Sequence, residues 1–135
     1  MKKITITLSE KQMNVLCQAL DSYSRAKLGQ FGYALEHVCR PNKAHCKYHE
    51  KIELENIIKK MFFPELGPNC YYGIFSEKVS DDARIAYDIY KVLSHYEAFN
   101  KRPEGGIEHW FDKPSKTSLT EELPELTTQA EGKEK

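Results

Sequence analysis

The segment Ser9–Val38, SEKQMNVLCQALDSYSRAKLGQFGYALEHV, carries the longest helical repeat in this chain. Ser9 followed by Gln12 is a capping-box pattern, which predicts a helix start. Pro41 limits how far the helix can extend. Between them, apolar positions recur every three or four residues, at Met13, Leu16, Leu20, Tyr23, Lys27 (through its aliphatic stem), Phe31, Ala34 and Val38. The pattern predicts one helix over about residues 10–38, with Gly29–Gly32 as the place where it can bend.

A second face of this predicted helix carries Ser22, Arg25, Gly29 and Gly32, which follow one another at helical spacing. Glycine in a helix interior costs about 1 kcal/mol relative to alanine, and here it occurs twice. Small residues allow close approach, either by a partner helix or by a ligand. Two interpretations stay open: helix packing with Arg25 in a surface ion pair, or an anion site where Arg25 binds a phosphate.

Outward from this helix, residues 2–8 are predicted to form a short strand, because apolar residues alternate with threonine from Ile4 to Leu8. Helical spacing predicts two more helices, over about residues 50–62 and 80–99, and IEHWFD at 107–112 fits a second strand. We therefore expect an α+β fold, dominated by helices, with a small antiparallel β-ribbon made by the two ends of the folded region. The helix over 80–99 has two apolar stripes, so we expect it to be covered on both sides, with another subunit as the second partner.

Residues 1–115 of the 135-residue chain are predicted to form one domain. Residues 116–135, where apolar residues become rare, are predicted to be a disordered polar tail. Lysine plus arginine and aspartate plus glutamate both number 20, which argues against a protein dedicated to duplex nucleic acid. No apolar run approaches a membrane span or a secretion signal. The four cysteines are expected to be reduced, in a cytoplasmic protein.

Other candidate binding residues lie in the second half of the chain. The loop NCYYGIFS places Tyr71 and Phe75 where they could stack on a base, although loop aromatics more often fill a core. KRPEGG adds Arg102 beside a flexible turn. Arg84 and Asp88 lie on one face of the third predicted helix, where a solvated charge ladder is the more common explanation.

Two kinds of chemistry have weaker sequence signals. The residues His37, Cys39, His45, Cys46 and His49 are of the types that bind zinc, but their spacing matches no standard finger. A flexible basic connection is the alternative. No hydrolase, metalloprotease or phosphate-loop motif occurs, so catalysis is not expected.

Four segments together resemble a bacteriophage protein family. They are LDSYSRAKLGQF, MFFPELGPNCYYGI, VSDDARIAYDIYKVL, and RPEGG followed by WFD, and the resemblance covers about residues 2–113. The family is that of the Thoeris anti-defence proteins, which sequester the cyclic ADP-ribose isomer made by a bacterial TIR-domain immune sensor and do not cleave it. Some members assemble as dimers or hexamers and also hold cyclic oligonucleotides.

The resemblance implies an anti-defence sponge for a cyclic nucleotide-type signal, assembled as a homo-oligomer in the cytoplasm of an infected bacterium. It implies phosphate contacts at Arg25 and Arg102 and a stacking contact at Phe75, with no cofactor and no metal. The full set of expected ligand-binding residues is Arg25, Gln30, Tyr71, Phe75, Arg84, Asp88 and Arg102. The alternative is a small zinc-dependent nucleic-acid-binding or regulatory protein.

Overall fold

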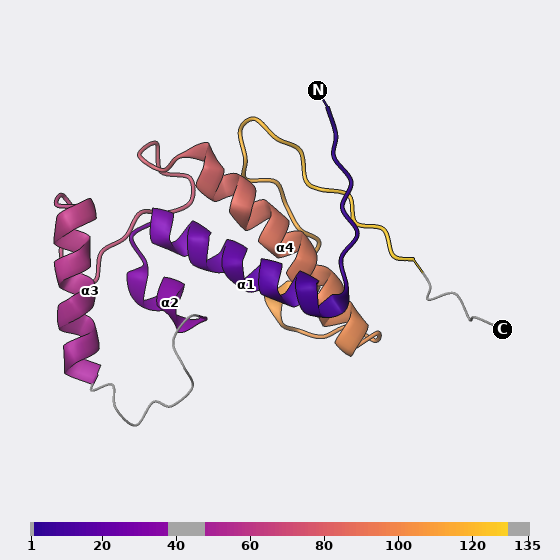
Figure 1. Ribbon diagram of the computed structural model, residues 1–135, viewed down its shortest axis with the longest axis horizontal. Helices are drawn as coiled ribbons and strands as arrows, with labels where there is room; N and C mark the ends of the chain where they lie inside the picture. The colour runs from indigo at the N-terminus through magenta and orange to yellow at the C-terminus, as the bar shows by residue number, and fades with distance from the viewer. Residues whose placement is uncertain (1, 38–47, 130–135) are drawn as a thin grey trace.

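The computed structural model describes residues 2–37 and 48–129, and within these ranges the regular structure is entirely helical. The elements are α1 (Glu10–Lys27), α2 (Phe31–Glu36), α3 (Tyr48–Phe62), α4 (Asp81–Lys101) and the 3-10 helix η2 (His109–Phe111). In Figure 1, α1 and α4 lie side by side, and α2 and α3 lie toward the end where α1 finishes. No helix in the described ranges is both long and apolar enough to cross a membrane.

Helix α1 begins as the sequence predicts. The backbone N–H of Gln12 donates to Ser9 Oγ at 3.3 Å, and the Gln12 side chain accepts from the Ser9 N–H at 2.9 Å. This reciprocal pair satisfies two of the backbone donors that a helix start leaves without partners. The capping box is therefore confirmed.

The predicted helix over residues 10–38 is in fact two helices. Helix α1 ends at Lys27, and α2 starts at Phe31. Between them, Gly29 has φ of +83°, a left-handed conformation that glycine adopts without steric cost. The Gly29 backbone therefore breaks the helix and turns the chain, and the helical spacing on either side simply continues in a second element.

The two glycines of this region are expected to respond differently to alanine. Gly29→Ala should lower the free energy of unfolding by about 1–2 kcal/mol, because alanine is strained at this φ and its Cβ would lie 3.0 Å from Leu66 Cδ1. At Gly32 the atoms nearest to a new Cβ belong to the carboxylate end of the Glu55 side chain, and that flexible side chain can rotate away. Gly32→Ala should therefore change stability by less than about 0.5 kcal/mol. Urea denaturation of both variants tests this, and equal losses would contradict it.

Helices α1 and α4 pack in antiparallel directions. Cys17 of α1 meets Ser94 of α4, with 3.4 Å between Sγ and Oγ. At the far end of α1, Leu28 packs against Val79 and Ala83, near the start of α4. Helices α1 and α4 make the most extensive contact between any two helices of the described chain.

The expected β-ribbon is wrong, and the fold is not α+β. Residues 2–8 form no regular structure, and Ile4 and Ile6 are exposed. Their predicted partner, residues 107–112, contains η2. There Trp110 packs edge-on against Tyr90 of α4, with 5.4 Å between ring centres, and Phe111 packs edge-on against Phe99, with 5.0 Å between ring centres. An alternating segment such as residues 2–8 forms a strand only where a second strand supplies hydrogen bonds. Here residues 107–112 cannot be that strand, because Trp110 and Phe111 pack on α4 instead.

The same contacts correct the expectation that another subunit covers the second side of α4. The segment around η2 packs on α4 within the same chain. Beyond it, Thr117 and Ser118 are buried against the N-terminal half of α4. Both lie in the stretch whose composition predicted a disordered tail, so the chain's own C-terminal segment supplies the cover.

Candidate functional site

Arg25 lies at the centre of a small polar cluster near the end of α1. Its Nε donates to Asp21 Oδ1 at 2.8 Å, one helical turn earlier, and its Nη1 donates to Gln30 Oε1 at 2.9 Å. The guanidinium also lies 5.3 Å from the centre of the Tyr33 ring. Gln30 is within reach because the Gly29 turn folds the chain back, with the Gln30 N–H donating to the Arg25 carbonyl at 2.9 Å.

Asp21 holds this cluster together. It is buried, and its second oxygen, Oδ2, lies 2.8 Å from His37 Nε2. Arg25 has five N–H donors, and the described contacts use two of them. The remaining donors belong to a side chain that is about one-third exposed, so the cluster fixes the direction of an arginine that can still bind an anion.

A groove of about 560 Å³ lies beside this cluster, between α1, α4 and the segment around η2. Aromatic residues Tyr90 and Trp110 line it together with His37, and charged residues Glu97, Lys101 and Glu108 also lie along it. His37 belongs to both the groove and the Asp21 contact. The groove therefore combines aromatic surface with an end that is linked to Arg25.

Two titratable groups of the groove remain neutral at pH 7. Burial raises the pKa of the Cys17 thiol, and the nearby Glu97 and Asp21 charges raise it further against the lowering effect of Ser94. Burial, followed by the charge of Asp21, raises the pKa of Tyr90 to about 12. A protonated thiol is a poor nucleophile, so Cys17 is not activated for nucleophilic attack.

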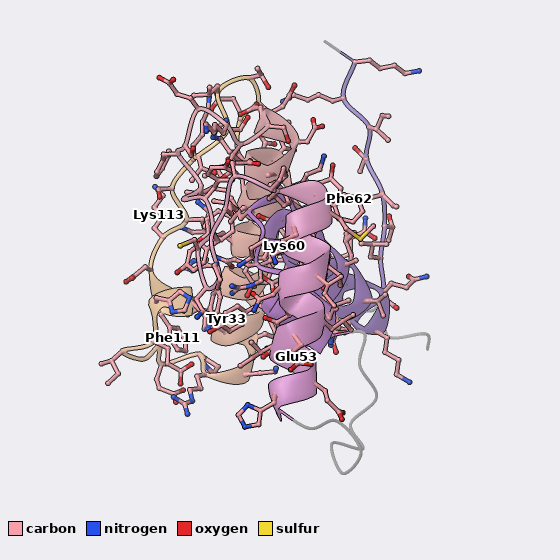
Figure 2. All side chains as sticks on the ribbon, turned by 90° about the vertical axis from the view of Figure 1, so that its left-hand side faces the viewer. Tyr33, Glu53, Lys60, Phe62, Phe111 and Lys113 are labelled. Atoms are coloured by element: carbon pink, nitrogen blue, oxygen red, sulfur yellow. The ribbon has the colours of Figure 1, made fainter. Side chains whose placement is uncertain are left out.

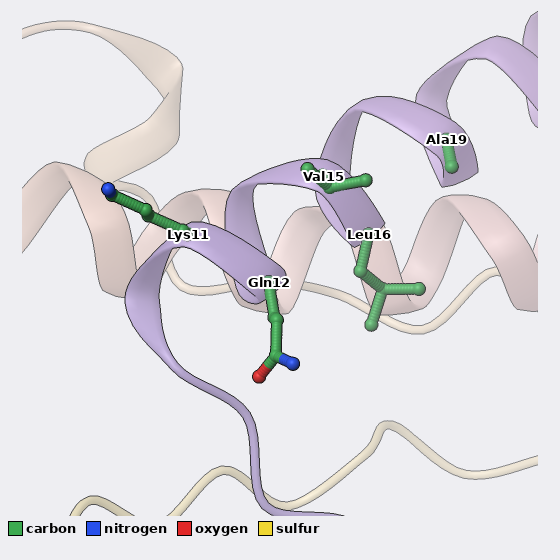
Figure 3. A pocket seen from close by; sticks show the side chains of 5 residues that line it. All are labelled: Lys11, Gln12, Val15, Leu16 and Ala19. Carbon is green, nitrogen blue, oxygen red and sulfur yellow. The ribbon is translucent and has the colours of Figure 1, made fainter.

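A second hollow, of about 430 Å³, lies over the first half of α1 (Figure 3). Five side chains of that one helix line it: Lys11, Gln12, Val15, Leu16 and Ala19. Ligand sites need several polar groups that converge from different elements, and this hollow does not have them. We therefore place the candidate site at the Arg25 cluster.

Tyr71 and Phe75 lie on the loop between α3 and α4, and both are exposed. The loop is attached beside the Gly29 turn, since the Tyr72 N–H donates to the Leu28 carbonyl at 2.9 Å. Tyr71 and Phe75 are therefore not part of the core, whereas Tyr72 of the same loop packs against it, as the alternative interpretation predicts. Of the seven expected ligand residues, Arg25, Gln30, Tyr71 and Phe75 are thus carried by neighbouring segments at one end of α1.

Arg84 has a different place from the one expected for a ligand residue. It is buried, and it donates to three backbone carbonyls of the preceding loop: Ile74 at 2.9 Å, Ser76 at 2.8 Å and Val79 at 3.1 Å. These bonds attach the loop that carries Phe75 to the start of α4. Arg84 therefore acts as a positioning residue for that loop.

Asp88 is also buried, and it binds the C-terminal segment. Both of its oxygens accept from the Thr117 N–H at 2.9 Å, Oδ1 accepts from Thr117 Oγ1 at 2.6 Å, and Oδ2 accepts from the Ser118 N–H at 2.8 Å. Lys91 Nζ lies 3.1 Å from Oδ1. Burial acts to raise the pKa of Asp88, but these hydrogen bonds outweigh it and lower the pKa. Asp88 is therefore not part of a solvated charge ladder. It is a buried residue that attaches the C-terminal segment to α4.

Arg102 lies at the opposite end of the helix pair from Arg25. It is exposed and makes one long ion pair, 3.8 Å to Glu108. Arg25 and Arg102 are each eight residues from the Cys17–Ser94 contact, in opposite directions, so the helical rise puts their backbones roughly 24 Å apart. One protomer does not bring both arginines to the same diphosphate.

The zinc alternative is only partly within the described residues. His37 is bonded to Asp21, and Cys39, His45 and Cys46 lie outside the described ranges. Among residues 2–37 and 48–129, no group of three or more potential ligands is arranged to hold a metal. The cluster as a whole stays an untested prediction.

The sequence interpretation that placed Arg25 in an ion pair is confirmed, with Asp21 as the partner it did not name. It missed Tyr33 beside Arg25, and His37, which is bonded to Asp21. The Asp21–Arg25 pair had a signal, because aspartate and arginine four residues apart on a helix form ion pairs. Comparison with models of protein families, with curated proteins and with solved structures finds no match for this chain. The resemblance to the Thoeris anti-defence family therefore stays an expectation that rests on the four quoted motifs.

Proposed function

We propose that this protein captures a nucleotide-type signalling molecule of the cyclic ADP-ribose class and holds it without cleaving it. In this proposal it is a bacteriophage anti-defence sponge that acts in the cytoplasm of an infected bacterium. The observation that carries the proposal is the Arg25 cluster, where Asp21 and Gln30 orient a guanidinium that keeps unused donors. Phosphate oxygens are the acceptors that suit such a fork.

The aromatic surroundings support a ligand that contains a base. Phe75 and Tyr71 expose their rings on a loop held at the same end of α1. Stacking of a base on an aromatic ring contributes about 1–3 kcal/mol. An oriented arginine together with an exposed aromatic ring suits a molecule with both phosphate and purine, which is the chemistry of a cyclic ADP-ribose isomer.

The state of the groove supports capture without chemistry. Its thiol, Cys17, has a pKa raised by burial and so stays protonated. A protonated thiol is not an activated nucleophile, and a sponge needs none.

The separation of the two arginines supports a homo-oligomer. Arg25 and Arg102 are roughly 24 Å apart along the helix pair, so a diphosphate that contacts both must take them from two protomers. A dimer, or a hexamer built from dimers, provides such shared sites. We propose that Arg102 of one protomer completes the site that Arg25 of another begins.

The central experiment is to incubate the protein with cyclic ADP-ribose isomers, remove unbound ligand, denature the protein by heat and analyse what is released. Intact ligand in stoichiometric amount is the expected result. Release of a converted product would mean that the protein is an enzyme that acts on the ligand. No retained ligand would remove the proposed function.

Arg25→Ala is expected to abolish retention in this assay, because it removes the oriented guanidinium. It should also lower the free energy of unfolding by about 1–2 kcal/mol, since Asp21 stays buried with one partner fewer. Lys27→Ala is the matched control, because it removes a positive charge from the same helix end, where Lys27 is exposed and its Nζ lies 5.4 Å from the centre of the Tyr23 ring. Retention by Arg25→Ala, or its loss in Lys27→Ala, would contradict the assignment of Arg25.

A further inference from the structure

Helix α3 has an apolar face that the rest of the described chain leaves uncovered. Leu54, Ile57 and Met61 are 54%, 56% and 71% exposed, and they follow one another at intervals of three and four. Among the helices of residues 2–37 and 48–129, α3 contacts only α2. An exposed apolar stripe of this kind marks an interaction surface more often than a solvated face.

The opposite face of α3 accounts for its attachment to the protein. Lys59 is buried and donates to the Cys70 carbonyl at 2.7 Å. Phe63, directly after the helix, packs against Phe31 at 5.8 Å and Tyr72 at 6.0 Å. The stripe of Leu54, Ile57 and Met61 therefore points away from these contacts and is free to meet another molecule.

Two charges flank the stripe on one side. Glu53 and Lys60 are exposed, seven residues apart and so on the same face, and neither has an ion-pair partner in the described part of the chain. Figure 2 looks onto α3 and labels both on the helix, in front of α1 and α4. One negative and one positive charge at this spacing match the same pair on a second helix that runs the other way.

We propose that α3 pairs with α3 of a second copy of this chain in antiparallel orientation. Leu54 of each copy then packs against Ile57 of the other, around a two-fold axis. In this register Glu53 of each copy lies opposite Lys60 of the other, so the interface contains the same opposite-charge pair twice. The apolar spacing and the two charges are therefore self-complementary in this register.

The charges also select between the two registers that the apolar spacing allows. If the helices slide by one heptad so that Ile57 packs against Met61, Lys60 lies opposite Lys60 of the other copy. Like charges at flanking positions disfavour that pairing. The pattern therefore specifies one arrangement with a second copy, and a partner of another kind would have to reproduce the same alternation of charge.

The test is sedimentation equilibrium of the full chain between micromolar and submillimolar concentration. We expect a monomer–dimer equilibrium, with Glu53→Lys and Lys60→Glu each raising the dissociation constant about tenfold because both symmetric pairs become repulsive. The double variant with both substitutions restores the opposite pairs, so it should associate like the wild type. In the absence of ligand, Ile57→Glu should give a monomer at all concentrations, and at a concentration where the wild type is also monomeric its thermal unfolding temperature should be unchanged because Ile57 is exposed.

Several outcomes would overturn the inference. A wild-type monomer throughout the concentration range would leave the stripe to a different partner. An oligomer that survives Ile57→Glu would place the interface on another surface. Single charge variants that associate normally, or a double variant that does not recover, would exclude the antiparallel register. Retention of the ligand is measured separately, so the inference can fail while capture stands.

Discussion

Replacing Arg84 by alanine is expected to lower the free energy of unfolding by about 3–5 kcal/mol. The buried guanidinium donates to the carbonyls of Ile74, Ser76 and Val79, and its Nη1 also lies 3.7 Å from Asp81 Oδ1. Hydrogen bonds from a charged group contribute about 1.5–3 kcal/mol each, and their loss would leave several carbonyls without a donor. Chemical denaturation at pH 7 measures the effect.

Arg102→Ala is the matched control for this variant. Arg102 is exposed, with a single ion pair at 3.8 Å, so its removal should change the free energy of unfolding by less than about 0.5 kcal/mol. Arg84→Lys should lie between the wild type and Arg84→Ala, since one ammonium group cannot reach three carbonyls that a planar fork satisfies. Similar losses in Arg84→Ala and Arg102→Ala would refute the structural role of Arg84.

The same variant separates positioning from ligand contact. Because Arg84 holds the backbone at Ile74 and Ser76, it fixes the position of Phe75 between them. Loss of Arg84 is therefore expected to weaken ligand retention without Arg84 touching the ligand. Phe75→Ala removes the ring but none of these backbone contacts, so it should weaken retention while leaving stability nearly unchanged.

The elements that follow from local sequence were predictable. The helices over about 50–62 and 80–99 occur as α3 and α4, and Ser9 and Gln12 form the expected cap. Helical spacing and capping are properties of a few neighbouring residues, so the sequence displays them directly. The break after Lys27 was visible only as a possible bend, because the decisive feature is the left-handed conformation of Gly29.

The parts that depend on distant contacts were not predictable. The spacing of Arg84 and Asp88, four residues apart on a helix, predicted a solvated row of charges. In the structure Arg84 binds the loop before its helix, and Asp88 binds Thr117, 29 residues later. The predicted ribbon failed for the same reason, since Trp110 has a better partner in Tyr90 than in another strand. Spacing predicts which residues share a face, but it does not identify what covers that face.

The C-terminal segment is held by two carboxylates of α4. Asp81 accepts from the Leu119 N–H and Ser118 Oγ, each at 2.8 Å, and from Thr120 Oγ1 at 2.6 Å. The hydrogen bonds from Leu119, Thr120 and Ser118 hold the pKa of Asp81 well below its usual range. Asp88 binds the residues just before these. The two carboxylates are seven residues apart on α4, and together they bind the backbone and side chains of residues 117–120.

Asp88→Asn is expected to lower the free energy of unfolding by about 2–4 kcal/mol at pH 7, and the loss should depend on pH. The asparagine amide has one acceptor oxygen where the carboxylate has two, so its NH₂ group would face the N–H donors of Thr117 or Ser118. Asp82→Asn is the matched control, since Asp82 is the exposed neighbour of Asp81 in the same helix.

The direction of the pH effect follows from the lowered pKa of Asp88. The carboxylate of the folded protein resists protonation more than that of the unfolded chain, whose pKa is near the ordinary value of 3.8. Its contribution is therefore complete above that value and is lost as the pH falls through the lower pKa of the folded state. The stability difference between wild type and Asp88→Asn should be constant near neutral pH and should shrink as the pH is lowered below about 4, in denaturation curves measured at each pH. A stability difference that stays constant with pH would mean that the charge of Asp88 does not stabilise the bound segment at Thr117 and Ser118, and that only the shape of the side chain matters.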